Sequence, residues 1–382
     1  MDEESLHVMQ EECELVFSNT LKELSNIVML RPLSNVFLQR SNNLQFDASI
    51  KIAPTSNVLL LTVSKGVYVQ FYDTIKDHHQ LLSDAVFPAD MGVDVTKLNI
   101  LDTLFDLSFN FVLQHELNHI LCGHLDYQRA TKGVDLAEYA MSESLCELGG
   151  LSDDILRSYY LEVEADGTAI EWMLERLQFK QLNNDLNALL KAKFSSDMAS
   201  LSIMDLPRAT RDIGFRYLLV SVWLVICLME SNRSESVKEY NITHPLPAAR
   251  LISAINILML YYAKLSKLRI PDSGEMWVSP SSSDTQAMQE YLTNVVKPVI
   301  KSFAGINPTM QKFPLVIPYG GSNYGENLVN LLMDVKGLLK NEDNKSEVMI
   351  QVSRIESVRS EILEALEEFR YMEGMRKNDS SI

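Results

Sequence analysis

The sequence has few positive charges and few cysteines. Its 34 Lys and Arg stand against 51 Asp and Glu, which gives a formal charge of -17. Nucleic-acid affinity comes largely from basic side chains that neutralise phosphates, so this balance argues against nucleic acid or an anionic membrane surface as a partner. The 4 cysteines have neither CxxC spacing nor the density of a disulfide-stapled secreted domain. We therefore expect a reducing, cytoplasmic location.

A membrane-length apolar run is also missing. The longest such run extends from Tyr217 to Met229 and is followed at once by Glu230, whereas a spanning helix needs about 20 apolar residues. We interpret this run as a buried core helix. The segment from Met1 to His7 is acidic where a secretory signal is basic and then apolar. The expectation is a soluble protein with no integral membrane segment.

Apolar residues make up 46% of the 382 positions, which is enough to bury one large core or two ordinary ones. Most of the chain has helical periodicity, which predicts an α+β fold that is mostly helical with a short sheet. Two strand segments are predicted, at 46–53 and at 58–71 around a turn at Ser64-Lys65-Gly66. The predicted helices span residues 10–30, 101–125, 153–177, 213–230 and 247–265.

A break rich in Pro, Gly and Ser at 270–285 divides the chain. We predict a first domain over 1–270, and a linker with a helical carboxy-terminal region over 271–382. That region ends in a long helix with an apolar stripe from Val348 to Phe369. We expect the stripe to dock on the body of the protein, and we keep pairing with a regulatory partner as the alternative.

The strongest motif is His-Glu-Leu-Asn-His at residues 115–119. His115 and His119 are one helical turn apart on one face, so both imidazoles can reach one metal ion. Glu116 projects about 100° away from His115 and is placed to contact a metal-bound water, for which it would act as general base. A metzincin would have Gly at 122 and His at 125, but the sequence has Cys122 and Leu125. That class is excluded, and a pair of buried histidines without metal is the alternative.

A second motif lies downstream, where Glu162 and Asp166 are four residues apart and share a helix face. Glu164 lies about 200° from Glu162 and faces away. Glu162 can complete a His-His-Glu site, and Asp166 can accept a hydrogen bond from the second nitrogen of a ligand histidine. Alone, the pair would indicate a solvated helix face. The upstream histidines favour the metal interpretation instead.

A third element is His244-Pro245, just before a predicted helix with Pro247 in its first turn. Held rigid before proline, His244 could be carried over the site and donate to the oxyanion of a tetrahedral intermediate. By itself His-Pro indicates an ordinary turn.

Taken in order, these motifs resemble the gluzincin family that contains the CAAX prenyl proteases and HtpX heat-shock proteases. The residues that carry the resemblance are 115–119 with His124, then 162–166, then His244-Pro245-x4-Arg250, within roughly 55–265. The resemblance implies a zincin-like catalytic domain that hydrolyses peptide bonds in protein substrates with one Zn²⁺ per chain. The roles it implies are zinc ligation by His115, His119 and Glu162, general base for Glu116, ligand orientation for Asp166, and closure of the site by His244 and Arg250.

Three features qualify this resemblance. His124 comes five residues after His119 and would point about 140° off the ligand face, so we interpret it as structural. Asn118 replaces the family's usual Gly or Ala, which predicts a nearby hydrogen-bond partner or less room for substrate. The transmembrane helices of the family are missing, and the overall character of the chain also resembles the phage-exclusion peptidases of bacteria.

The sequence therefore favours a zinc metalloendopeptidase, with two alternatives. In one, the zinc is a structural clamp in a binding or scaffold protein, although structural zinc usually has four protein ligands rich in Cys. In the other, the peptidase is latent, and residues 271–382 cover its cleft until a partner releases it.

Overall fold

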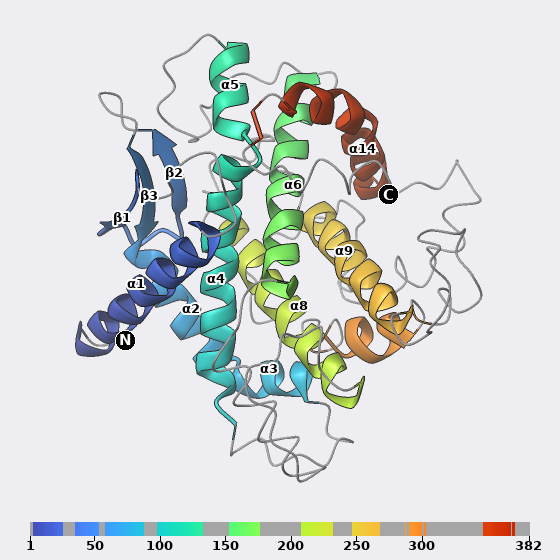
Figure 1. Ribbon diagram of the computed structural model, residues 1–382. Helices are drawn as coiled ribbons and strands as arrows, with labels where there is room; N and C mark the ends of the chain where they lie inside the picture. Colours follow the sequence, from blue (N-terminus) through green and yellow to red (C-terminus); the bar gives the residue numbers. More distant parts are fainter. Residues whose placement is uncertain are drawn as a thin grey trace.

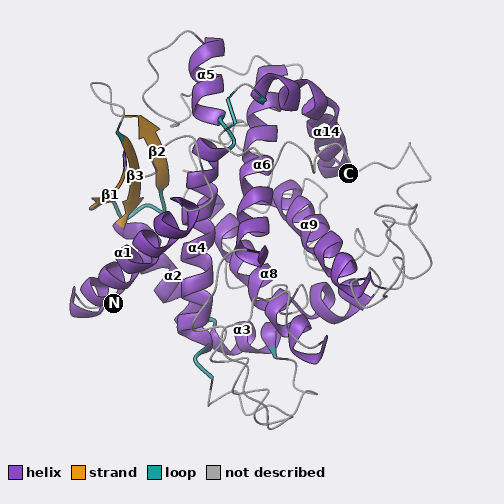
Figure 2. Ribbon diagram, in the orientation of Figure 1, coloured by secondary structure: helices purple, strands orange, loops and turns teal. Residues whose placement is uncertain are grey.

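The computed structural model describes residues 3–25, 35–52, 58–87, 98–132, 153–175, 208–231, 247–267, 287, 290–299, 302, 347–367 and 369–370. Most of these residues are helical, as the colouring of Figure 2 shows. The strands are β1 (Val36–Ser41), β2 (Ala48–Ile52) and β3 (Leu59–Ser64). The helices are α1 (Glu3–Ser25), α2 (Lys65–Asp77), α3 (His79–Val86), α4 (Ile100–Leu121), α5 (His124–Lys132), α6 (Asp153–Glu175), α8 (Arg208–Ser231), α9 (Pro247–Lys267), the π-helical turn η5 (Leu292–Val296) and α14 (Glu347–Leu366).

The sheet is small and lies at one side of the molecule, beside α1 and α2 (Figure 1). Its strand order is β1-β3-β2, with β1 parallel and β2 antiparallel to β3. Leu59, Leu61 and Val63 alternate along β3 and are buried, as expected of a strand with one face on a core. The mostly helical α+β class predicted from the sequence is confirmed.

The predicted strand at 58–71 is wrong beyond Ser64, where the chain enters α2. Val67, Phe71 and Ile75 recur at four-residue spacing and are fully buried, so a helical period lay under the β-branched and aromatic composition. The junction is held by backbone contact: a Cβ on Gly66 would fall 2.1 Å from the carbonyl oxygen of Gln45. Only glycine allows so close an approach at this position.

Two helices form the centre of the core. α4 is buried along nearly its whole length and packs against both α6 and α8 (Figure 1). α8 contains a stretch, Arg211–Met229, that is long and apolar enough to cross a membrane by length and composition, and 89% of it is buried inside the protein. The interpretation of this run as a buried core helix is confirmed.

The carboxy-terminal helix α14 packs on α6 and α5 through a second apolar cluster. Ile362 and Leu366 of α14 are fully buried in this cluster, which also contains Tyr159 and Leu161 of α6. An ion pair joins the same two helices at the surface, with Arg157 Nη2 2.5 Å from Glu361 Oε1. Docking of the stripe on the body is thus confirmed for its described side chains, while the domain boundary at 270 stays a prediction.

Candidate metal centre

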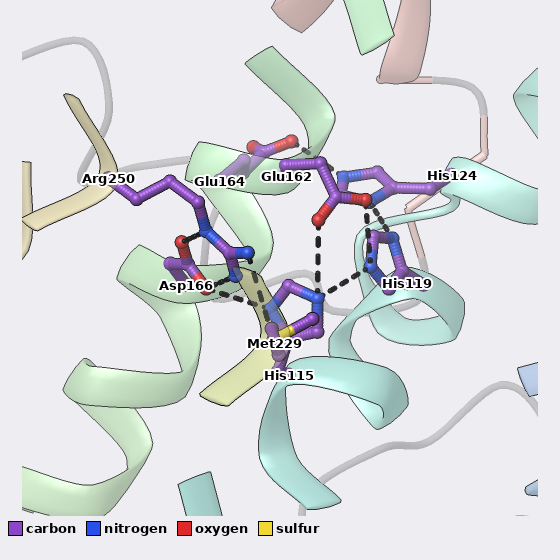
Figure 3. Close-up of polar contacts among 8 residues, drawn as sticks. All are labelled: His115, His119, His124, Glu162, Glu164, Asp166, Met229 and Arg250. Atoms are coloured by element: carbon purple, nitrogen blue, oxygen red, sulfur yellow. Dashed lines mark hydrogen bonds and ion pairs between the residues drawn. The ribbon is translucent and has the colours of Figure 1, made fainter. Parts of the chain in front are cut away.

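The predicted ligands come together where α4 and α6 lie side by side (Figure 3). α4 contributes His115 and His119 from successive turns, and α6 contributes Glu162. All three side chains are almost completely buried. One ligand atom from each lies within 4.8 Å of the other two, so the group could hold a metal ion.

The spacing of these ligand atoms matches a single ion. The two Nε2 atoms of His115 and His119 are 3.2 Å apart. Glu162 Oε2 lies 3.5 Å from His115 Nε2, and Glu162 Oε1 lies 3.7 Å from His119 Nε2. A tetrahedral ion with bonds of about 2.0 to 2.1 Å spaces its ligand atoms about 3.4 Å apart. The three distances between residues are close to this spacing.

His115 contacts Asp166 through Nδ1, the ring nitrogen that does not face His119 and Glu162. Asp166 lies one turn after Glu162 on α6. His115 Nδ1 lies 2.9 Å from Asp166 Oδ1. Arg250 of α9 grips the same carboxylate with two hydrogen bonds of 2.6 Å, donated by Nε and Nη2. Burial by itself raises the pKa of Asp166, but Arg250 and His115 outweigh burial and hold that pKa below its usual value. Asp166 is thus an ionised acceptor for the ring of His115.

Burial and neighbouring charges also shift the pKa values of His115 and Glu116. Burial lowers the pKa of His115, but the contacts with Asp166 and Glu162 outweigh it and raise the pKa to about 10. Burial raises the pKa of Glu116 to about 8; the positive charge of His115 opposes this rise and the carboxylate of Glu162 adds to it. Without metal, the site therefore holds protons strongly near neutral pH.

His119 has a different set of contacts, and here the structure differs from the sequence interpretation. His119 Nδ1 lies 2.9 Å from His124 Nδ1, and His124 Nε2 lies 2.9 Å from Glu164 Oε2. Glu164 is also ion-paired with Arg370, which follows α14. The expected direction of His124 assumed that the helix continued through it. Instead α4 ends at Leu121, and the chain turns before α5 begins at His124.

The turn depends on Gly123, whose φ of 80° is in the left-handed region. A glycine just after the last helical turn is a usual signal for a helix end, so the change of direction could have been read from Gly123. Sequence reasoning missed Glu164 and Arg370 as contributors, since Arg370 lies 206 residues further along the chain.

The remaining predicted residues are placed as follows. Glu116 is buried on α4, between the two histidines in sequence. Asn118 is fully buried, but within the described part of the chain neither polar atom of its side chain has the predicted hydrogen-bond partner. Cys122 is buried beside Thr168, and burial raises the pKa of its thiol well above the usual range. His244 lies outside the described residues.

Cys122, His124 and Glu164 form a second group with ligand-like spacing. Both nitrogens of His124 are within hydrogen-bonding distance of side chains, and Glu164 is neutralised by Arg370. A second cation would have to compete with the guanidinium, so we assign no metal to this group.

Comparison with known proteins supplies a family. The family model described as Peptidase U49 matches residues 67–264, which is more than half of the chain. No curated protein and no solved structure matches. The resemblance to CAAX prenyl and HtpX proteases is not confirmed by these comparisons and stays an interpretation, as does the likeness to phage-exclusion peptidases. The matched region spans α2 to α9 and contains all three candidate ligands. The chain belongs to the Peptidase U49 family, a family of peptidases.

Proposed function

We propose that this protein is a zinc-dependent endopeptidase that cleaves protein substrates, with zinc held by His115, His119 and Glu162 and with Glu116 as general base. The observation that carries the proposal is the buried group of His115, His119 and Glu162, whose ligand atoms lie 3.2 to 3.7 Å apart between residues, within a chain of a peptidase family. Two imidazoles and one carboxylate form the donor set of many catalytic zinc sites, which keep a fourth position open.

Zinc in such a site supplies Lewis-acid polarisation of a carbonyl and a water made acidic near neutral pH. The protein's own groups prepare that chemistry. Asp166 Oδ1 lies 2.9 Å from Nδ1 of His115 and its charge favours a proton on that nitrogen, so that Nε2 of this ring would present its lone pair to the metal. Arg250 keeps Asp166 ionised and fixed, which is a positioning role. His244 remains a proposed donor to the oxyanion.

Glu116 is suited to move a proton. It lies next to His115 on α4 and is buried, and in the metal-free protein burial raises its pKa to about 8. A general base works best when its pKa lies near the working pH, because it can then both accept and return the proton. We propose that Glu116 takes a proton from the attacking water and passes it to the leaving amine.

We also propose that an extended substrate binds by strand addition at an edge of the sheet. The segment around Ser64 belongs to β3, which is paired on both sides and offers no edge. β2 lies at an edge of the described sheet and contacts α4. Its outer backbone groups are therefore the better site for pairing with a peptide strand.

The decisive variant is Glu116→Gln, which keeps the shape of the side chain and removes the base. We expect peptide hydrolysis to fall by about 100-fold or more, while zinc content, measured by elemental mass spectrometry, stays near one per chain. The matched control is Glu361→Gln, an exposed position on α14. Terminal-peptide mass spectrometry of cells that express each form would identify substrates. Cleavage retained by Glu116→Gln would sink the assignment of the base.

A second measurement separates the enzyme from the structural clamp. The cobalt-substituted protein should carry a water that exchanges with solvent, detected by water-proton relaxation. Absence of such a water would favour a closed structural site and a binding or scaffold protein.

A further inference from the structure

We propose that the segment after α14 is part of the metal centre, with Arg370, Glu164 and His124 acting as positioning residues that orient His119 and select its metal-binding tautomer. This inference rests on the metal centre proposed above. It assigns a role to a residue that lies beyond the matched family region, which ends at 264.

The contacts form one continuous, buried chain of polar side chains from His119 to Arg370. His119 and His124 are joined at 2.9 Å through their Nδ1 atoms, and Nε2 of His124 lies 2.9 Å from Glu164. Glu164 Oε1 accepts from Nη2 of Arg370. The two histidines are buried, and Glu164 and Arg370 are 11% and 5% exposed. In such a buried site, charge-assisted hydrogen bonds are stronger than at the surface, because the local dielectric constant is lower.

Only one arrangement of protons along this path allows His119 to bind metal. Nε2 of His119 must present a lone pair, so its proton sits on Nδ1 and is donated to Nδ1 of His124. His124 then carries its own proton on Nε2 and donates it to Glu164. The reverse arrangement would place a proton on His119 Nε2, where it would face His115 Nε2 at 3.2 Å and block the metal position. The ionised Glu164, held by Arg370, favours the first arrangement.

The two ligand histidines are thus supported in parallel ways. His115 contacts Asp166, which is gripped by Arg250 of α9. His119 reaches Glu164 through His124, and Glu164 is held by Arg370. Both carboxylates project from α6, the helix that also supplies the metal ligand Glu162 (Figure 3). In each case the last residue of the set of contacts is an arginine from a distant part of the chain.

Arg370 is placed by close packing at the junction of α4 and α5. The chain after α14 turns tightly, with Phe369 N and Arg370 N donating to the carbonyl oxygen of Leu366 at 2.9 and 3.1 Å. The backbone of Phe369 lies directly against Gly123, where an added Cβ would be 2.5 Å from the Phe369 oxygen. The ring of Phe369 also packs edge-on against Tyr127. The segment after α14 therefore packs specifically against the turn that positions His124.

The test uses the full chain, with Zn²⁺ and Co²⁺ as the metals. In Glu164→Gln and Arg370→Gln we expect the dissociation constant for Zn²⁺, measured by chelator competition, to rise about 10- to 100-fold, as is typical when a ligand's outer hydrogen bond is lost. The d–d absorption of the Co²⁺ protein should also shift, because the ring of His119 is reoriented. Arg370→Lys, which keeps the charge but not the fork, should restore part of the affinity.

The matched control is Arg157→Gln. This variant breaks the Arg157–Glu361 ion pair between α6 and α14. The Glu164–Arg370 pair makes a similar link from α6 to the segment after α14. The Arg157–Glu361 pair contains none of the candidate metal ligands. We expect its metal affinity and cobalt spectrum to match those of the wild type. Circular dichroism and thermal unfolding establish that each variant is folded. Should Arg370→Gln not fold, Glu164→Gln decides the question by the same two measurements.

The outcomes separate this inference from the proposed function. Wild-type protein that binds neither metal would overturn the metal centre itself. Wild-type protein that binds zinc tightly, with Glu164→Gln and Arg370→Gln indistinguishable from Arg157→Gln, would overturn the positioning role and leave the proposed function standing. Equal losses in Arg157→Gln and Arg370→Gln would show that general docking of α14 matters, and would also overturn the inference.

Discussion

Glu116 is a carboxyl group kept in a place that favours its neutral form. Burial removes the water that would stabilise its charge, and this raises its pKa from 4.5 to about 8. His115 has a raised pKa for the opposite reason, because the nearby carboxylates outweigh burial and favour the protonated ring. The metal-free site is therefore proton-rich, and metal binding must displace protons from it.

This shift predicts how the stability of the metal-free protein depends on pH. A pKa that is raised in the folded state stabilises that state below the unfolded pKa, and the contribution is lost as pH rises through the folded pKa. For Glu116 the window runs from 4.5 to about 8. We therefore expect the free energy of unfolding of the wild type, relative to Glu116→Gln, to fall steadily across that window. Urea denaturation of chelator-treated samples measures it, and a constant difference between the two proteins would contradict the pKa shift.

At the scale of elements, the site depends on how α4 ends. The shared face of the two candidate ligand histidines needs only the helix itself, because residues four apart lie on one face. The support of His119 needs the helix to stop at Leu121 and the chain to turn at Gly123, with φ 80°. The packing of the segment after α14 depends on the same glycine, since the Phe369 backbone lies where a Cβ on Gly123 would be.

Gly123→Ala should therefore weaken both the fold and the metal site. We expect a loss of about 1 to 2 kcal/mol from the left-handed backbone, with more from the clash against Phe369, and a rise in the zinc dissociation constant. The control is Gly167→Ala in the middle of α6, where the new Cβ would lie 2.8 Å from Cδ1 at the end of the Ile257 side chain and would meet no backbone. Chemical denaturation and chelator competition on both variants test this. Equal behaviour of the two variants would show that the turn does not depend on glycine.

At the scale of the whole molecule, the candidate metal centre lies between α4 and α6, two of the helices that pack in the core. α4 packs against α8, α6 packs against α9 and α14, and the three candidate ligands come from α4 and α6. An ion bound here would be linked to the folding of the entire core, because the unfolded chain cannot hold the three ligands together.

Metal removal should accordingly destabilise the whole protein. Each tenfold rise in Zn²⁺ above its dissociation constant should add about 1.4 kcal/mol to the free energy of unfolding. Thermal unfolding in buffered zinc and in chelator should show a midpoint that rises with zinc concentration. The variant Glu162→Gln, which loses one ligand, should show much less dependence on zinc. An unchanged midpoint after complete removal of metal would argue against a bound ion at this site.

Much of the candidate site could be predicted from local spacing. The pairs His115 with His119 and Glu162 with Asp166 are each one helical turn apart, and the period of the α-helix alone decides that each pair shares a face. The convergence of both pairs on one point was an expectation, and the contact of α4 with α6 now places them together. The failed strand at 67–71 shows the limit of composition, since its residues follow a helical period.

The sequence by itself determined the long helices, the faces that carry the ligands and the apolar stripe of α14, because these follow from the repeat of the helix and from burial of apolar side chains. Only the tertiary structure decided which side chains support Nδ1 of His119. The path from His124 through Glu164 to Arg370 depends on a left-handed turn at Gly123 and on an ion pair across 206 positions of sequence. No local pattern specifies such a contact, because it forms only when the core has brought α6 and the segment after α14 together.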